Sequence, residues 1–254
     1  MVNKISLLVN SLNEFDNLKK NIIPIVDVFD EVVIVDMESN DGSRELFQNI
    51  ENAKFIEIEK MGYVEPARKA GIDACKNDFI FILDADESPS EKIISEMTKF
   101  QSAKDKSGFD DVKTSGVFIP RLNRMFDRDI MWGKFSPEND RQLRFFKKDT
   151  VIVTDVIHSG LKFGKHVKDV RTLPFNEGYY LYHYHSNSAL EFISRLVRYA
   201  EFESSSNKGE NSFNVKGAVK AFIREYFAER GFKHGKVGFA LAYILSLRAF
   251  LKGL

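Results

Sequence analysis

Five consecutive large apolar residues lead directly into a pair of aspartates near residue 80. The run Phe79 to Leu83 is rich in β-branched and aromatic side chains, and Asp84 and Asp86 follow it at once. An unbroken apolar run of this length is typical of a strand that helices cover on both faces, as in the parallel sheet of an α/β protein. The stretch therefore predicts a buried strand whose carboxyl end carries two acids.

The residues that follow the two acids have the signature of a helix N-terminus. Ser88 is expected at the N-cap, Pro89 at the first helical position and Glu91 at the third. If extended geometry persists past the strand, Asp84 and Asp86 leave the backbone on the same side. Ligands of open α/β sheets bind outside the carboxyl ends of the strands, and paired carboxylates there suit Mg²⁺ or Mn²⁺. A solvated acidic turn before a capped helix is the alternative interpretation of an isolated Asp-x-Asp pair.

Strand and helix patterns alternate through the first half of the chain. The predicted strands are 5–9, 31–36 and 53–58, and the predicted helices are 14–28, which contains Pro24, then 44–50 and 64–76. Ser11 and Glu14 stand in capping-box spacing before the first helix. This alternation indicates right-handed βαβ units in a mixed, mostly parallel sheet flanked by helices. We expect Asp36 and Asp84 to end neighbouring strands of that sheet.

The second half of the chain is β-rich and ends in helices. The predicted strands are 117–121, 142–146, 151–157 and 179–185, and the predicted helices are 188–204, 215–230 and a last one from about 236. We therefore divide the chain into an α/β domain, residues 1–187, and a C-terminal helical extension, residues 188–254, packed on it. The aromatic residues of the extension are typical of a packing layer, and contact with a membrane surface or an acceptor remains open.

Charge and cysteine content exclude several classes of protein. The chain has 37 basic and 37 acidic side chains, so no positive excess is present to follow a phosphate backbone, and no nucleic acid partner is expected. The single cysteine, Cys75, cannot form an internal disulfide, and Met1–Lys4 leads into a strand instead of a signal-peptide apolar region. We expect a cytoplasmic protein. Residues 237–247 form an apolar segment of 11 residues, too short to span a membrane, which takes about 20. Peripheral contact at the inner face of the plasma membrane stays open.

Four motifs in the first ninety residues resemble, in order and spacing, the inverting family 2 glycosyltransferases of GT-A fold. They are Ile5–Glu14, Val35–Asp36 with Ser39–Ser43, Ala67–Gly71, and Leu83–Glu87. A looser likeness to the branch that includes lipopolysaccharide-core β-glucosyltransferases rests on 141–146, 156–158, His183 and 230–235. The resemblance implies a Rossmann-like GT-A sheet and a hexosyltransferase.

The resemblance also implies roles for individual residues. Those expected to hold the nucleoside of the donor are Asn10, Leu12, Glu14 and Asp36. Arg68 would approach the diphosphate, Asp84 would contact the ribose or a metal-bound water as part of the metal site, and Asp86 would bind the metal directly. A divalent cation in that place stabilises the charge that develops on a departing nucleoside diphosphate.

Inversion in a single displacement also needs a general base within reach of the attacking hydroxyl. The family draws this base from an acidic motif in its second half, and the nearest match here is Pro137–Arg141. We assign the role to Asp140, with Glu138 as the alternative residue. A surface ion pair of Asp140 with Arg141 or Arg144 is the competing interpretation.

The histidines and the single tryptophan are further candidates. His158 could complete the metal shell or touch the diphosphate, and a structural, hydrogen-bonded histidine is the competing interpretation. His183 and His185 face one side of a predicted strand and are typical of structural residues. Trp132 suits either the core or an acceptor sugar.

These features predict a metal-dependent inverting glycosyltransferase that uses Mg²⁺ or Mn²⁺. It would move a hexose from a nucleotide sugar, preferably UDP-linked, to a glycan or lipid-linked glycan in cell-surface polysaccharide or lipopolysaccharide synthesis. A homo-oligomer remains open. One alternative is a non-catalytic nucleotide- or glycan-binding module of the same fold. Another is a sugar nucleotidyltransferase, although Asn10–Glu14 lacks the glycine and lysine that such an enzyme usually has after its first strand.

Overall fold

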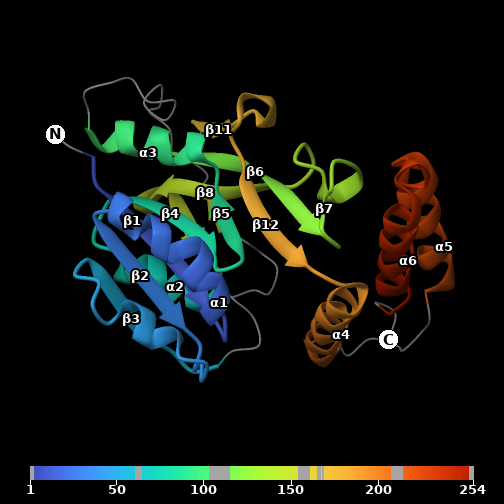
Figure 1. Cartoon of the computed structure of the whole chain (residues 1–254), viewed down its shortest axis with the longest axis horizontal. Helices are drawn as coiled ribbons and strands as arrows, with labels where there is room; N and C mark the ends of the chain where they lie inside the picture. Colours follow the sequence, from blue (N-terminus) through green and yellow to red (C-terminus); the bar gives the residue numbers. More distant parts are fainter. Residues whose placement is uncertain are drawn as a thin grey trace. The chain divides into compact units, whose positions relative to one another are not determined.

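The structure, a computed structural model, describes residues 3–60, 65–102, 115–153, 161–164, 167, 169–206 and 214–251. The chain divides into two compact units (Figure 1), and the first contains residues up to Arg121 together with Arg141–His183. The second contains Leu122–Asp140 and Tyr184–Leu254. Residues 122–140 thus group with the C-terminal helices, and the boundary at residue 187 stays a prediction.

Within the described residues the main sheet has ten strands, and four of them form a parallel core. Its strands are β1 (Ile5–Ser11), β2 (Glu31–Asp36), β3 (Ala53–Glu57), β4 (Phe79–Asp84), β5 (Glu87–Pro89), β6 (Gly116–Met125), β7 (Arg128–Asp129), β8 (Arg141–Lys147), β11 (Val170–Thr172) and β12 (Leu181–Ser186). The order is β3-β2-β1-β4-β8-β6-β12-β5, with β7 and β11 both paired to β6. Strands β1 to β4 run parallel (Figure 1), and β8 adds to β4 in the antiparallel sense. A separate two-stranded sheet pairs β9 (Val151–Val153) with β10 (Leu161–Phe163).

Helical segments connect these strands and form the end of the chain. They are α1 (Phe15–Asn17), η1 (Leu18–Ile22), η2 (Ile23–Val28), η3 (Ser43–Phe47), α2 (Glu65–Ala74), α3 (Glu91–Ser102), η4 (Gly133–Phe135), η5 (Lys148–Thr150), η6 (Phe175–Glu177), α4 (Ala189–Ser206), α5 (Val215–Ile223), η7 (Arg224–Ala228), η8 (Gly231–His234) and α6 (Gly235–Leu251). No helix in the described part of the chain combines the length and apolarity needed to cross a bilayer. The predicted mixed α/β sheet with flanking helices and a helical C-terminal part is confirmed.

The parallel strands are buried on both faces, as their apolar runs predict. Leu7 of β1 belongs to a cluster with Ile22 of η1 and Met97 of α3, whereas the next residue, Leu8, belongs to a cluster with Ile72 of α2. Successive side chains of a strand point to opposite faces, so one continuous apolar run supplies two cores. Cys75 lies in the second cluster, and burial raises the pKa of its thiol to about 12.

The second unit has an apolar core of its own. Met125 and Ile130 pack with Phe192 of α4 and with Leu241 and Ile244 of α6. The core therefore combines residues from the 122–140 segment with two of the C-terminal helices, which is why these stretches form one unit although they are distant in sequence.

The first helix differs from the prediction in its start and its geometry. Ser11 is part of β1, paired with Asp36, so it cannot cap a helix. Glu14 is the N-cap of α1, but its side chain makes no capping hydrogen bond and accepts from the side chain of Asn17 instead. The backbone N–H of Phe15 instead donates to the carboxylate of Asp41 at 2.8 Å. The path to Val28 passes through π and 3₁₀ turns, since Pro24 lacks the N–H that an α-helix would need there.

The helix after the two acids begins later than predicted. Glu87–Pro89 form β5 and pair with Leu181–His183 of β12, so Ser88 is in a strand and not at an N-cap. Ser90 takes that position, because its hydroxyl accepts a hydrogen bond from the N–H of Ile93. Extended geometry also does not persist through Asp86, since the chain turns at residues 85–86.

Gly71 lets α2 lie directly on the sheet. A Cβ at this position would lie 2.3 Å from Cδ1 of Leu8 and 2.9 Å from Cγ2 of Val35, and both of these side chains are fully buried. The methyl group of an alanine at position 71 therefore fits only if the side chains of Leu8 and Val35 move away from α2.

We expect Gly71→Ala to lower the free energy of unfolding by about 1–3 kcal/mol, as overpacked cores do, although alanine favours a helix by about 1 kcal/mol over glycine. Denaturant unfolding measures the change. The control is Lys69→Ala on the exposed side of the same helix, where we expect a change within about 0.5 kcal/mol. A more stable Gly71→Ala protein would contradict the close approach.

Candidate functional site

Polar side chains from three parallel strands form a row at the carboxyl edge of the sheet. Asn10 pairs in register with Asp84 of β4, and Ser11 pairs with Asp36 of β2. Strand β1 lies between β2 and β4, so Asp36 and Asp84 do not end directly neighbouring strands as predicted, and Asn10 and Ser11 separate them. This edge is where open α/β sheets bind their ligands.

Two members of this row are buried without hydrogen-bond partners. Asn10 is 6% and Ser11 is 1% exposed. Among the described residues, nothing pairs with either end of the Asn10 amide or with the Ser11 hydroxyl. A buried polar group left unpaired costs about 1–3 kcal/mol, so such groups are expected where a ligand supplies the partner.

Hydrogen bonds from the loop that follows β2 hold the side chain of Asp36 in a fixed orientation. Its two carboxylate oxygens accept hydrogen bonds from the N–H and the hydroxyl of Ser39, at 2.7 and 2.6 Å. The Ser39 hydroxyl in turn accepts from the N–H of Asn13, and the N–H of Asn40 donates to the side chain of Asn13. The loops after β1 and β2 are thus joined beside Asp36.

Asp41 completes the junction of these two loops. It accepts from the N–H and hydroxyl of Ser43 as well as from the N–H of Phe15. Burial alone would raise the pKa of Asp41, but the hydrogen bonds from Ser43 and Phe15 lower it below its ordinary value. The carboxylate therefore stays ionised, which suits the start of a helix.

Asp84 is held by two arginines. Nη2 of Arg144 lies 2.5 Å from Oδ2 of Asp84, and Nη2 of Arg68 lies 3.2 Å from Oδ1. Burial by itself would raise the pKa of Asp84, but Arg144 and Arg68 keep it far below the usual carboxyl range. Direct coordination of a cation by Asp84 would have to compete with these ion pairs.

Glu87 joins Asp84 to Arg144 from a fully buried position. Its Oε1 lies 2.6 Å from Nη2 of Arg144 and 3.4 Å from Nη1 of Arg121, and its Oε2 accepts from the N–H of Asp84. Burial would lower the pKa of Arg144, but Asp84 and Glu87 raise it above its ordinary value. We call Arg68, Arg121, Arg144, Asp84 and Glu87 the arginine cluster.

The sequence predicted Arg68 and Asp84 as site residues, but it did not predict the other three members of the arginine cluster. It gave Glu87 and Arg121 no individual role, and it suggested Arg144 only as a surface partner of Asp140 and as part of the 141–146 motif. A usable signal was present, since Arg144 lies between Leu143 and Phe145 in an apolar strand, and a charged residue inside a buried strand needs an opposite charge nearby.

Asp86 faces His183 across the turn after β4. Oδ2 of Asp86 lies 3.6 Å from Nε2 of His183, and both residues are buried. The turn is fixed by Asn21 of the π-helical segment η1, whose amide donates to the carbonyl of Ala85 at 3.0 Å. The second acid of the Asp-x-Asp pair thus has surroundings different from those of the first.

The donor set around Asp86 fits a cation that substrate oxygens complete. Among the described residues, no group of three His, Cys, Asp or Glu side chains is placed to hold a metal ion alone. Mg²⁺ is commonly bound through one or two carboxylates together with phosphates and water, and Mn²⁺ prefers the same oxygen ligands. Asp86 and His183 would supply the protein's part of such a shell. His158, predicted as a further ligand, lies outside the described residues.

Asp140 belongs to the second unit and is 8% exposed, which contradicts the interpretation as a surface ion pair. Its Oδ2 accepts a hydrogen bond from the buried amide of Asn123 at 2.8 Å, and its N–H donates to the carbonyl of Ser136. Glu138 is exposed.

Lys134 lies in the same unit and has a lowered pKa. Burial of its side chain, and to a lesser degree the positive charge of Arg248, lowers the pKa of Lys134 to about 8.

The remaining predicted residues have packing contacts. Leu12 packs against the second core cluster, and the carboxylate of Glu14 accepts from Asn17. In the second unit, Trp132 stacks on His234, with ring centroids 3.6 Å apart and planes within 5°. His185 packs edge-on against Phe192. Structural roles for Trp132 and His185 account for these contacts.

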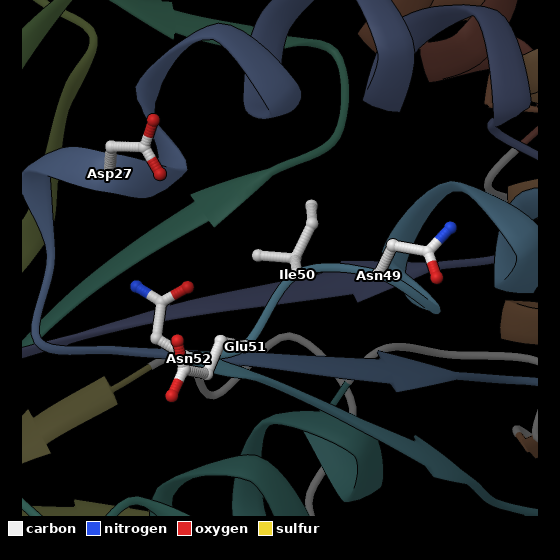
Figure 2. A pocket seen from close by; sticks show the side chains of 5 residues that line it. All are labelled: Asp27, Asn49, Ile50, Glu51 and Asn52. Carbon is white, nitrogen blue, oxygen red and sulfur yellow. The ribbon is translucent and has the colours of Figure 1, made fainter.

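A shallow hollow of about 550 Å³ lies at the opposite edge of the sheet. Figure 2 shows Asp27, from η2, and the loop residues Asn49 to Asn52, which line it. These segments precede β2 and β3, so the hollow is at the amino ends of the strands. It is therefore separate from the row of polar side chains at the carboxyl edge.

We expect Arg144→Met to lower the free energy of unfolding by about 3–5 kcal/mol, because it leaves the buried carboxylate of Glu87 and the partly buried carboxylate of Asp84 without their shared cation. The control is Arg44→Met, which removes a pair with Glu57 whose side chains are 65% and 56% exposed, and which should cost about 0–1 kcal/mol. Denaturant unfolding of both variants measures the difference. Equal losses in the two variants would contradict the structural role of the arginine cluster.

Comparison with known proteins agrees with this architecture. The model of the family described as Glycosyl transferase family 2 matches residues 6–160. An uncharacterized glycosyltransferase of Rickettsia bellii is 26% identical, over 99% of this chain and 85% of its own. One of Rickettsia typhi is also 26% identical, over 98% of this chain and 85% of its own.

Solved structures give a more distant likeness. The crystal structure of S. aureus TarS 1-349 in complex with UDP has 16% identity and a TM-score of 0.45, over 94% of this chain and 75% of that one. The family model spans more than half of the present chain. The chain therefore belongs to glycosyltransferase family 2, and it is a glycosyltransferase.

Proposed function

We propose that this enzyme transfers a hexose from a nucleotide sugar, UDP-linked by preference, to a glycan or lipid-linked glycan acceptor, with inversion at the anomeric carbon and with a divalent cation. The pathway we propose is cell-surface polysaccharide or lipopolysaccharide synthesis. The observation that carries the donor site is the row of Asn10, Ser11, Asp36 and Asp84 at the carboxyl edge of the sheet. The UDP complex of TarS is consistent with a nucleotide-sugar donor.

The nucleoside would bind along β1 and β2. Asp36 is oriented by Ser39, and Asn10 has unpaired hydrogen-bonding groups in a buried position. A preformed acceptor and an unpaired amide can both bond to a base or ribose without rearrangement of the loops, which lowers the cost of ordering the site. Leu12 and Glu14 would border this part of the site.

The diphosphate would lie beside the arginine cluster. Three arginines face two carboxylates there, so one positive charge remains in excess. The side chains of Arg68 and Arg121 are 16% and 18% exposed, whereas that of Arg144 is 3% exposed. We assign contact with the donor to Arg68, and the internal pairing to Arg144. Guanidinium groups suit this role because they bind phosphate oxygens with directed hydrogen bonds.

Asp86, together with His183, would hold the divalent cation. When bound, that cation acts as a Lewis acid and stabilises the negative charge on the departing nucleoside diphosphate. Asp84 would act through the ribose or a bound water, since its oxygens already accept from Arg68 and Arg144.

Asp140 would take the proton of the attacking hydroxyl. The amide of Asn123 binds its Oδ2, so the carboxylate has a fixed orientation. A general base needs such a position more than it needs high exposure. The exposed Glu138 is the alternative residue for this role.

We expect Asp86→Asn to reduce transfer by about 100- to 1,000-fold, the scale of losing one electrostatic stabiliser of the transition state. UDP-, GDP- and dTDP-sugars with Mn²⁺ and candidate acceptors are compared by release of the nucleoside diphosphate. Asp149→Asn, at an exposed acid paired with Lys147, is the matched control and should keep full activity. Undiminished turnover in Asp86→Asn would remove the proposed metal role.

A second experiment separates donor binding from chemistry. Asp140→Asn should retain the affinity for the donor nucleotide in calorimetry while kcat falls about 100- to 10,000-fold, as expected for loss of a general base. Glu138→Gln, tested in parallel, should retain most of its activity. If Asp140→Asn loses binding and turnover to the same extent, Asp140 has a structural role instead.

A further inference from the structure

The C-terminal helices carry a contiguous apolar surface within the second unit. Its main residues lie on α5, η7, η8 and α6 and are 47–57% exposed: Val219, Ile223, Phe227, Phe232, Phe239 and Tyr243. We call this set the aromatic face. Single exposed apolar residues are common on soluble proteins, but a continuous patch marks an interaction surface.

Ring contacts make the aromatic face one surface. Tyr226 lies at its centre, with its ring centroid 5.1 Å from that of Phe227, 6.4 Å from that of Phe232 and 5.9 Å from that of Phe239. Phe239 also stacks on Tyr243 one helical turn later. These contacts join rings from η7, η8 and α6 into one surface.

Basic side chains accompany the aromatic face. Val219 and Ile223 are each followed by an exposed basic residue, Lys220 and Arg224. Residues 214–251 contain seven basic and two acidic side chains, in a chain whose formal net charge is zero. One of the two acids, Glu225, is buried with its carboxylate on Arg224 at 2.7 Å. Residues 214–251 therefore combine an excess of positive charge with the exposed rings of the aromatic face.

The exposed rings and the positive charge together favour one of the surfaces that could cover the aromatic face. A second copy of the chain in a two-fold contact would bring the same patch, and hence the same positive charge, against it. A bilayer with anionic headgroups offers an apolar layer for the rings and negative charge for the lysines and arginines. A helix that lies in the interface needs no membrane-spanning length.

We propose that the aromatic face docks the enzyme on a membrane surface rich in anionic phospholipid. Phe227, Phe232, Phe239 and Tyr243 enter the boundary between headgroups and acyl chains, and Lys216, Lys220 and Lys236 bind the headgroups. Aromatic side chains favour this depth because their rings are apolar and their edges tolerate water. The inference does not depend on the donor, the acceptor or the metal.

The test is co-sedimentation of the full chain with vesicles of phosphatidylcholine and phosphatidylglycerol, and with vesicles of phosphatidylcholine alone. We expect binding to the anionic vesicles that weakens as salt is added, and little binding to the neutral ones. Equal binding to both vesicle types, or no binding to either, would overturn the proposal.

Charge variants test the basic side chains. Lys216→Glu, Lys220→Glu and Lys236→Glu together should weaken vesicle binding by on the order of 100-fold, since each basic residue near an anionic surface contributes about fivefold. The matched control is Lys4→Glu, Lys54→Glu and Lys76→Glu, which makes the same change of net charge at exposed positions of the first unit. If the control weakens binding equally, net charge and not this face is responsible.

Apolar variants test the rings. Phe227→Ser with Phe239→Ser should weaken binding by at least about tenfold because the apolar area that enters the lipid is lost. An unchanged far-UV circular dichroism spectrum confirms that the variant is folded. Unweakened binding would overturn the proposal. So would sedimentation equilibrium showing a dimer that this variant dissociates, because the face would then be an interface between copies.

Discussion

The site depends on the two ion pairs that the guanidinium of Arg144 makes. Arg144 lies between Asp84, at the end of β4, and Glu87, in β5, and it is itself a residue of β8. One buried cation thus ties together three strands that meet at the edge where a ligand would bind. Arg144 and Glu87 are buried and Asp84 is only partly exposed, so loss of Arg144 would leave both carboxylates without their shared cation in a place that water reaches poorly. The position of the Asp-x-Asp turn is fixed by this requirement.

As a result, Asp84 and Asp86 have different surroundings and suit different roles. Asp84 is bound by Arg68 and Arg144 and keeps its charge through them, which makes it part of the framework. Asp86 lies one turn later, beside His183, where the chain has left the strand. The same short motif therefore supplies one residue that shapes the site and one that we assign to the cation. An arginine-bound carboxylate is a poor direct ligand, since coordination would have to displace its partners.

We propose that the two units serve different tasks. In the first, paired loops and buried polar groups form the edge of the sheet where we propose that the nucleotide binds, and Ser39 holds Asp36 in a fixed orientation there. In the second, α4 and α6 build a separate core, and α5 and α6 carry aromatic and basic side chains at the surface. If the acceptor is lipid-linked, as we propose, docking on a membrane surface would raise the local concentration of that acceptor.

Sequence alone determined the buried parallel strands, since the mostly apolar runs 5–9, 32–35 and 79–83 leave no solvent-facing side, and it determined that acids follow the last two of these runs. It also identified the family from local motifs. Tertiary structure decided the rest: Ser11 and Glu87–Pro89 became strand because their pairing partners lie elsewhere in the chain. Likewise, Arg144 found Asp84 at a separation of 60 residues. Periodicity and capping signals act over a few residues, whereas ion pairs and strand pairing depend on segments that only the fold brings together.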